Sequence, residues 1–141
     1  MIGESADPIT TTIDAASVFT YVQAVGETNP AYPQSPNDAD GKVAPPTFAA
    51  VYALGAGSGS LARLGVSPSR LIHGEQQFTW RRALKVGETV TAQGTIADVY
   101  SKRSLNFVVA EAVVKDESGE EVGRSRATIL VLPEPNNGGE A

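Results

Sequence analysis

The sequence contains no cysteine and only one histidine, His73. Without cysteine, the chain can form neither disulfides nor thiolate metal sites. A single histidine also excludes the usual histidine-cluster metal sites and any mechanism that needs two histidines from one chain. We therefore expect no metal ion, and any catalytic site must be built from other residue types.

Basic charge and long hydrophobic runs are scarce as well. The 141 residues include 11 Lys and Arg against 16 Asp and Glu, and the resulting net charge of −5 argues against binding to nucleic acid or to an anionic membrane. The first ten residues carry acidic side chains and no apolar core, so we do not expect a secretory signal. Glycine, serine and Arg63 interrupt the apolar central run, which excludes a membrane span there. These features indicate one globular domain in the cytoplasm.

The most apolar stretch, from Val43 to Leu64, predicts a central helix. It opens with Pro45 and Pro46, which suit the first turn of a helix because no N–H is needed there. Apolar residues then recur at helical spacing, with alanines between them. A helix that is apolar or small all round is expected to be buried. The glycine–serine run at residues 55–60 either ends this helix or lets another backbone approach it closely.

The remaining segments predict one more helix, followed by strands. Asp14 and Gly26 suit the two ends of a helix at residues 15–25, and residues 29–32 suit a short helical turn before a surface loop. Four segments rich in alternating or β-branched residues predict strands, at 71–82, 89–100, 106–114 and 121–132. Helices followed by consecutive strands indicate an α+β fold. We expect a flexible N-terminus (1–12), one folded domain (13–132) and a disordered tail (133–141).

Three segments resemble the MaoC-like dehydratases of the hydratase-2 group, which act on enoyl and 3-hydroxyacyl thioesters. GETNPAY at 26–32 resembles the family motif D-x-N-P-x-H, and KVAPPTFAAVYAL at 42–54 resembles the start of its central helix. FTWRRALKVGETVTAQGTI at 78–96 resembles a strand–turn–strand block of the same fold. The resemblance spans about residues 13–132. It implies a single hotdog fold, in which a long antiparallel sheet wraps a central helix.

The resemblance also implies that the standard active site is altered. In the family, the motif aspartate and histidine hold a water, and a glycine N–H at the start of the central helix binds the thioester oxygen. The matching positions here are Glu27, Tyr32 and Pro45, and a proline has no N–H. Tyrosine, with a reference pKa of about 10, is a poor substitute for a histidine. The closest likeness is therefore to dehydratase-like subunits that lack the catalytic pair, and we expect no catalytic residues of the standard kind.

Other residues remain candidates for a site. Glu27 could still act as a base, and His73 and Glu75, two residues apart on a predicted strand, could pair on one face. Arg81 and Arg82 could bind the phosphates of coenzyme A or phosphopantetheine. Asn29 and Thr47 are the other candidates for substrate binding. Trp80 and Phe78 are expected in the core or at a dimer interface.

The resemblance implies a subunit of an (R)-specific enoyl-thioester hydratase or 3-hydroxyacyl dehydratase. Such a subunit would be non-catalytic and would shape the acyl-binding tunnel beside a catalytic partner chain. Three alternatives remain open: a self-sufficient homodimeric hydratase using Glu27, an acyl-CoA thioesterase using His73 or Glu75, and a module that binds acyl thioesters. An exposed sheet edge seeks a partner strand, so we expect a homodimer or a heterodimer. We expect no cofactor, with coenzyme A or phosphopantetheine only as the carrier of the substrate.

Overall fold

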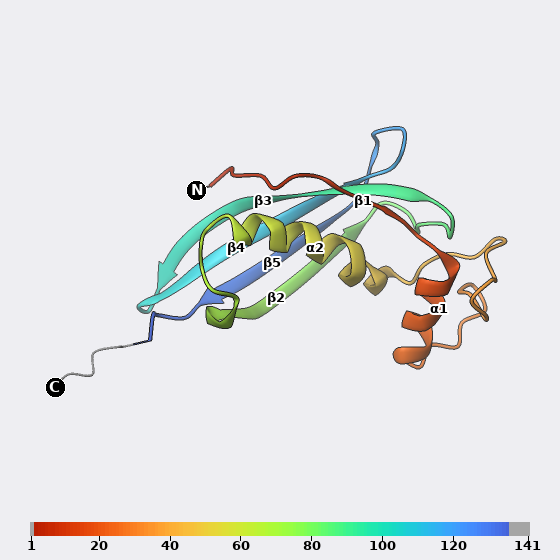
Figure 1. The fold of residues 1–141 in the computed structure, drawn as a ribbon, viewed down its shortest axis with the longest axis horizontal. Coiled ribbons are helices and arrows are strands. Elements are labelled where there is room, and N and C mark those ends of the chain that lie inside the picture. Colours follow the sequence, from red (N-terminus) through yellow and green to blue (C-terminus); the bar gives the residue numbers. More distant parts are fainter. Residues whose placement is uncertain (1, 136–141) are drawn as a thin grey trace.

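A five-stranded antiparallel sheet curves along one side of the helix α2 (Figure 1). The computed structural model describes residues 2–135. Its strands lie in the order β1-β3-β4-β5-β2. The elements are β1 (Ile9–Thr12), α1 (Ala15–Ala24), α2 (Ala49–Ala62), β2 (Leu71–Trp80), β3 (Thr89–Lys102), β4 (Leu105–Lys115) and β5 (Glu121–Val131), with 3₁₀ turns at Pro46–Phe48 and Pro68–Arg70. The predicted α+β fold, a central helix wrapped by an antiparallel sheet, is confirmed.

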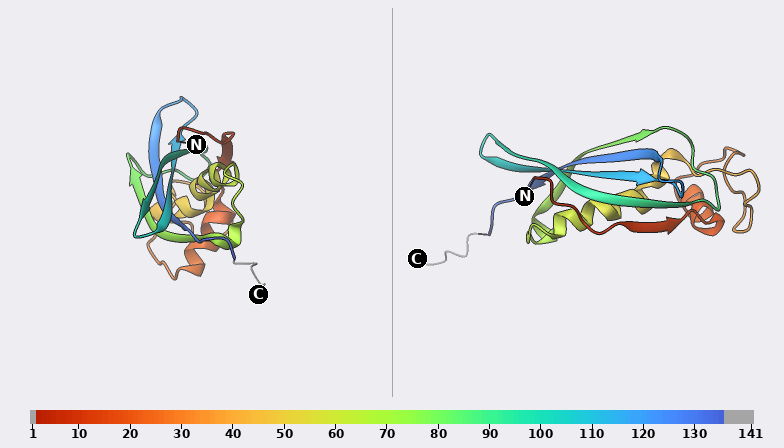
Figure 2. Two further views of the ribbon diagram at one scale, coloured as in Figure 1. Left: turned by 90° about the vertical axis from the view of Figure 1, so that its left-hand side faces the viewer. Right: turned by 90° about the horizontal axis from the view of Figure 1, so that it is seen from above.

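The central helix has one buried and one exposed side. Seen from above, α2 runs along a single face of the sheet, and α1 lies near one end of the sheet (Figure 2). Tyr52, Ala53 and Ala56 face the sheet and are buried, whereas Val51 keeps 54% of its surface exposed. Burial all round was therefore a wrong expectation, because the sheet covers only one side of α2 within the described chain.

The glycine–serine run lies inside α2 and does not end it. Ala56 and Gly57, within this run, lie where the helix approaches the sheet closely. An ideal Cβ built on Gly94 of β3 would lie 2.0 Å from the carbonyl oxygen of Ala56, and one built on Gly57 would lie 4.0 Å from the Cβ of Ala110. Of the two possibilities that the sequence left open, close approach of backbones is the one observed.

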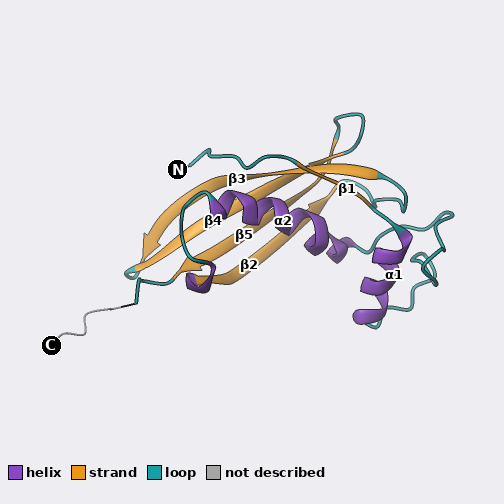
Figure 3. Cartoon of the chain, viewed as in Figure 1, coloured by secondary structure: helices purple, strands orange, loops and turns teal. Residues whose placement is uncertain are grey.

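The N-terminal segment contradicts the expectation of a flexible arm. Ile9–Thr12 form β1, which pairs with β3 (Figure 3). The side chains of Thr10 and Thr12 lie 3.1 and 3.0 Å from the hydroxyls of Thr91 and Thr89. All four residues of the segment are β-branched, which favours a strand, but its shortness led to the expectation of a flexible terminus. It is ordered because β3 is 14 residues long and offers β1 a free edge.

Two further expectations concern the ends of the chain and the membrane. Residues 136–141 of the predicted disordered tail lie outside the described residues. Within residues 2–135, no helix is long and apolar enough to cross a membrane.

We predict that Gly94→Ala destabilises the protein, because the added methyl group would collide with the backbone of α2 at Ala56. The free energy of unfolding should fall by about 2–3 kcal/mol in urea titration, as expected for overpacking a close contact. Gly55→Ala is the matched control, because Gly55 lies in α2 with nothing within 4 Å of the added Cβ. That control should raise the stability by about 0.5–1 kcal/mol, as for a glycine in a helix interior. Equal effects of the two substitutions would contradict the close packing.

Candidate functional site

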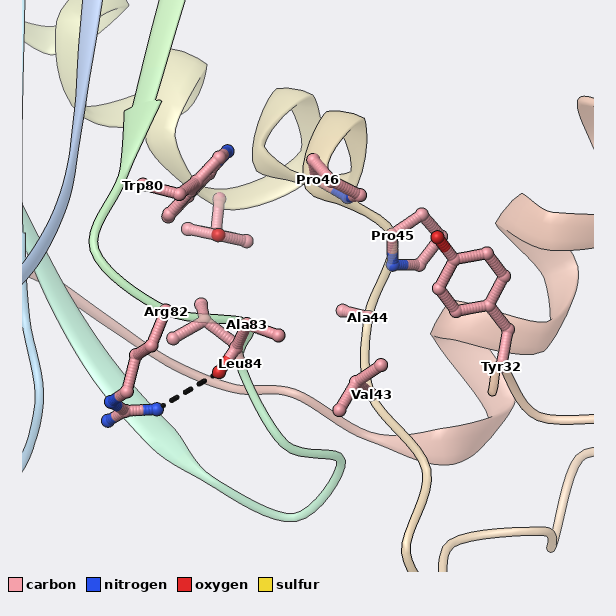
Figure 4. Close-up of a pocket in the computed structure, with 10 residues that line it drawn as sticks. Tyr32, Val43, Ala44, Pro45, Pro46, Trp80, Arg82, Ala83 and Leu84 are labelled. Atoms are coloured by element: carbon pink, nitrogen blue, oxygen red, sulfur yellow. Dashed lines mark hydrogen bonds between the residues drawn. The ribbon is translucent and has the colours of Figure 1, made fainter. Parts of the chain in front are cut away.

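A cavity of about 200 Å³ lies where the chain enters α2 (Figure 4). Its wall comes from four parts of the chain: the loop after α1, the segment leading into α2, the first turn of α2, and the end of β2 with the segment that follows it. The residues that line it are Tyr32, Val43, Ala44, Pro45, Pro46, Tyr52, Trp80, Arg82, Ala83 and Leu84. Most of these side chains are apolar, so the cavity suits an apolar group.

Aromatic rings form one wall of this cavity. The ring centroids of Trp80 and Tyr52 lie 6.1 Å apart, and Phe48 and Phe78 extend the same group at 5.9 Å from Tyr52 and 6.4 Å from Trp80. Burial, and secondarily the charge of Glu88, raises the pKa of Tyr52. Its hydroxyl therefore stays protonated at neutral pH and cannot act as a base.

Arg82, at the edge of the cavity, is held by two carboxylates. Its Nη1 donates to Glu88 Oε2 at 2.9 Å, its Nη2 contacts Glu88 Oε1, and Asp116 Oδ2 lies 3.2 Å from Nη2. The hydrogen bond with Glu88 raises the pKa of Arg82, and in return it lowers the pKa of Glu88. The guanidinium expected to bind phosphate is thus already neutralised by carboxylates of this chain.

Arg81 points elsewhere and is more weakly engaged. Its Nη2 lies 3.4 Å from Glu121 Oε2, and the same carboxylate is 2.7 Å from Arg124. The two neighbouring arginines therefore differ: only Arg82 lines the cavity.

The motif positions are separated in space. Tyr32 and Pro45 both line the cavity, whereas Glu27 does not. Glu27 lies in the exposed loop after α1, where its Oε1 accepts hydrogen bonds from the backbone N–H groups of Thr28 and Asn29 at 2.9 and 3.0 Å. A carboxylate used in this way stabilises the loop.

The two remaining substrate-binding candidates also have local partners. Asn29 Oδ1 accepts from the N–H of Ala31 at 2.9 Å, which forms the turn expected at NPAY, although no helix follows. Thr47 Oγ1 accepts from the hydroxyl of Tyr21 at 2.6 Å and so connects α1 to the turn before α2. Neither residue lines the cavity.

The expected pairing of His73 with Glu75 is wrong. A β-bulge lies between these residues, so that His73 pairs with Ile129 and Glu75 with Thr128. His73 consequently faces the side of α2, in a small cavity with Ser58, whereas Glu75 lies in a surface pocket on the other face with Arg126. The extra residue breaks the alternation of side chains that the prediction assumed.

Sequence reasoning missed the two residues that dominate the cavity wall, Tyr52 and Trp80. Trp80 was expected in the core or at a dimer interface, and Tyr52 was only one of the apolar residues of the helix. A signal was present in the spacing: Phe48 and Tyr52 lie four residues apart and share one face of the helix. Nothing in the spacing brings Trp80 to that face.

No carboxylate or imidazole lines this cavity among the residues described. Its polar groups are the phenols of Tyr32 and Tyr52, the guanidinium of Arg82 and the indole of Trp80. The arrangement can therefore hold an apolar ligand, but it offers no base that works near neutral pH.

The Arg82–Glu88 pair should make stability depend on pH. Because the folded-state pKa of Glu88 is lowered from its usual 4.5, its contribution is fully present above that pH and is lost as the pH falls through the folded-state pKa. Arg82→Ala should therefore reduce the free energy of unfolding at pH 7 by about 1–2 kcal/mol, with a smaller reduction at pH 3, in urea titrations. The control is Arg63→Ala, which removes an exposed ion pair with Asp7 and should change stability little at either pH. An equal loss at both pH values for Arg82→Ala would contradict the charge-based role.

Comparison with known proteins places the chain in a family. The family model described as "FAS1-like, dehydratase domain region" matches residues 1–124. UPF0336 protein Lxx02810 of Leifsonia xyli subsp. xyli is 36% identical over 91 residues, which cover 63% of this chain and 61% of that protein. A UPF0336 protein of Thermobifida fusca is 30% identical over 118 residues, which cover 79% and 77%. More than a third of the Leifsonia protein thus lies outside the match.

Solved structures show the same architecture. The HadBC (3R-hydroxyacyl-ACP dehydratase) complex of Mycobacterium tuberculosis contains a chain with a TM-score of 0.73 and 20% identity, covering 92% of this chain and 96% of that chain. A MaoC-like dehydratase has a TM-score of 0.81 and 17% identity, covering 94% and 42%. The ChsH1–ChsH2 complex of M. tuberculosis has a TM-score of 0.66 and 19% identity, covering 91% and 84%. The chain therefore belongs to the FAS1-like dehydratase-region family, and its fold is the hotdog fold of the MaoC-like dehydratases.

Proposed function

We propose that this chain is a non-catalytic, acyl-binding subunit of a cytoplasmic hydratase or dehydratase that acts on acyl thioesters. The observation that carries the proposal is the lining of the cavity at the start of α2, which is apolar and aromatic and includes no carboxylate or imidazole among the described residues. A partner chain of the same fold would supply the aspartate and the histidine.

Hydration of an enoyl thioester makes three demands. It needs a base to activate water, an acid to protonate the α-carbon, and a donor for the thioester oxygen. The carboxylate of Glu27 lies outside the cavity and accepts two backbone hydrogen bonds, and Pro45 has no N–H to offer. Tyr32, which does line the cavity, carries a phenol where the family motif has a histidine, so it supplies no imidazole base. A homodimer would repeat these deficits in both subunits, so a different catalytic chain is required.

The edge of β2 is the proposed contact with that partner. β2 is ten residues long, contains neither proline nor lysine, and pairs only with β5 among the described residues. Such an edge is open to a further strand. Ile72 on this strand keeps 46% of its surface exposed, which adds apolar area for a partner to cover. The HadBC and ChsH1–ChsH2 structures, in which the similar chains occur as complexes, support a pairing of unlike subunits.

We predict that the purified chain alone does not hydrate crotonyl-CoA or longer enoyl-CoAs, measured by loss of the enoyl absorbance. Co-expression with a hotdog chain that carries an intact D-x-N-P-x-H motif should give a complex that does. Within that complex, Glu27→Ala should change kcat/KM by less than about twofold, because a group outside the cavity does not contribute to the transition state. Glu117→Ala, in the turn after β4, is the matched exposed control.

One result would overturn the proposal. If the chain alone turned over enoyl-CoA and Glu27→Ala abolished that turnover, the chain would be a self-sufficient hydratase and Glu27 its base.

A further inference from the structure

We propose that Trp80 determines the length of the acyl chain that this subunit accepts, by closing the cavity at the start of α2. The inference rests on the proposed acyl-binding function and assigns a specificity-determining residue to it. Trp80 lies across the cavity from Tyr32 and Pro45 (Figure 4). An acyl chain that enters on the side of Tyr32 would meet the indole as the far wall.

The indole is held in place by a glycine on the neighbouring strand. Trp80 and Gly123 lie directly opposite each other in the β2–β5 ladder. An ideal Cβ built on Gly123 would lie only 2.3 Å from both Cε3 and Cζ3 of Trp80. The ring thus lies against the backbone of β5 at a distance that only glycine allows, and this contact gives the cavity its depth.

Aromatic neighbours hold the ring on its other sides. Phe78 stacks on Trp80 with an interplanar angle of 26°, and the ring of Tyr52 on α2 is tilted against it at 59°. The indole Nε1 is buried and has no hydrogen-bond partner within residues 2–135. Packing against Gly123, Phe78 and Tyr52, and not a hydrogen bond of the indole, therefore holds the ring in its orientation.

The cavity is small, so the position of the Trp80 wall limits the length of the ligand that fits. Its volume of about 200 Å³ is below the roughly 300–1,000 Å³ of pockets that bury drug-sized ligands. A short acyl chain fits such a space, and every further methylene must displace the indole or remain in water. Removing the indole would lengthen the cavity. Adding a methyl group at Gly123 would push the ring off the sheet, toward α2, and shorten it.

The experiment measures the affinity of the full-length chain for a series of saturated acyl-CoA thioesters from butyryl to palmitoyl. Trp80 is the only tryptophan in the sequence, so its fluorescence reports ligand entry directly, and calorimetry serves the variants that lack it. Each methylene that becomes buried should increase affinity about fourfold, and the increase should stop at the length where the chain reaches Trp80.

We expect the limiting length to move in opposite directions in two variants. Trp80→Ala should shift it to longer chains, with Trp80→Phe intermediate and available if the alanine variant does not fold. Gly123→Ala should shift it to shorter chains. Thr79→Ala is the matched control, because Thr79 adjoins Trp80 on β2 but is exposed and does not line the cavity, and it should leave the limit unchanged.

The outcomes separate this inference from the proposed function. If acyl-CoAs bind and the limit is the same in all folded variants, or if the variants lose affinity uniformly at every length, Trp80 is not the determinant, while acyl binding stands. If no acyl-CoA binds to the wild-type chain, both the acyl-binding function and the role of Trp80 are wrong.

Discussion

The close approach of α2 to the sheet is the constraint on which the rest of the molecule depends. At Gly94 the carbonyl of Ala56 occupies the space of a side chain, and Ala110 of β4 faces Gly57 nearby. Small residues thus bring the middle of the helix onto β3 and β4. At the start of the helix, bulky aromatic rings take the place of these small residues. Tyr52 of α2 and Trp80 of β2 lie there and line the cavity. The cavity lies where the tight packing at the middle of the helix gives way to aromatic rings at its start.

Residues at the motif positions also serve the fold. Pro45 precedes a 3₁₀ turn that leads into α2, and it lines the cavity without an N–H that could bind an oxyanion. Glu27 uses its carboxylate to hold the loop after α1. The carboxylates that do lie near the cavity, Glu88 and Asp116, are engaged by Arg82. Both carboxylates are thus engaged in ion pairs with Arg82, and the lining of the cavity itself is mostly apolar.

Packing across strands explains the second feature of the cavity, its closed end. Gly123 lets the indole of Trp80 lie flat on β5, and the register of the β2–β5 pair brings the two residues opposite each other. That register is set after a β-bulge near Gly74, which also turns His73 and Glu75 to opposite faces of the sheet. One extra residue in β2 therefore decides which of its side chains face α2 and which lie on the opposite face of the sheet.

The sequence by itself determined the class of fold, the order of its central helix and the four long strands, and the residue types at Glu27, Tyr32 and Pro45. These depend on local signals: the periodicity of apolar residues, capping residues such as Asp14, and residue types at fixed spacing. Only the tertiary structure decided that Ile9–Thr12 form an edge strand, that the bulge separates His73 from Glu75, and that Trp80 and Tyr52 meet at one cavity. Each of these features depends on contacts between residues that are distant in the chain. Such contacts set the strand register and bring the helix close to the sheet through the fit of side chains, which local sequence patterns do not reveal.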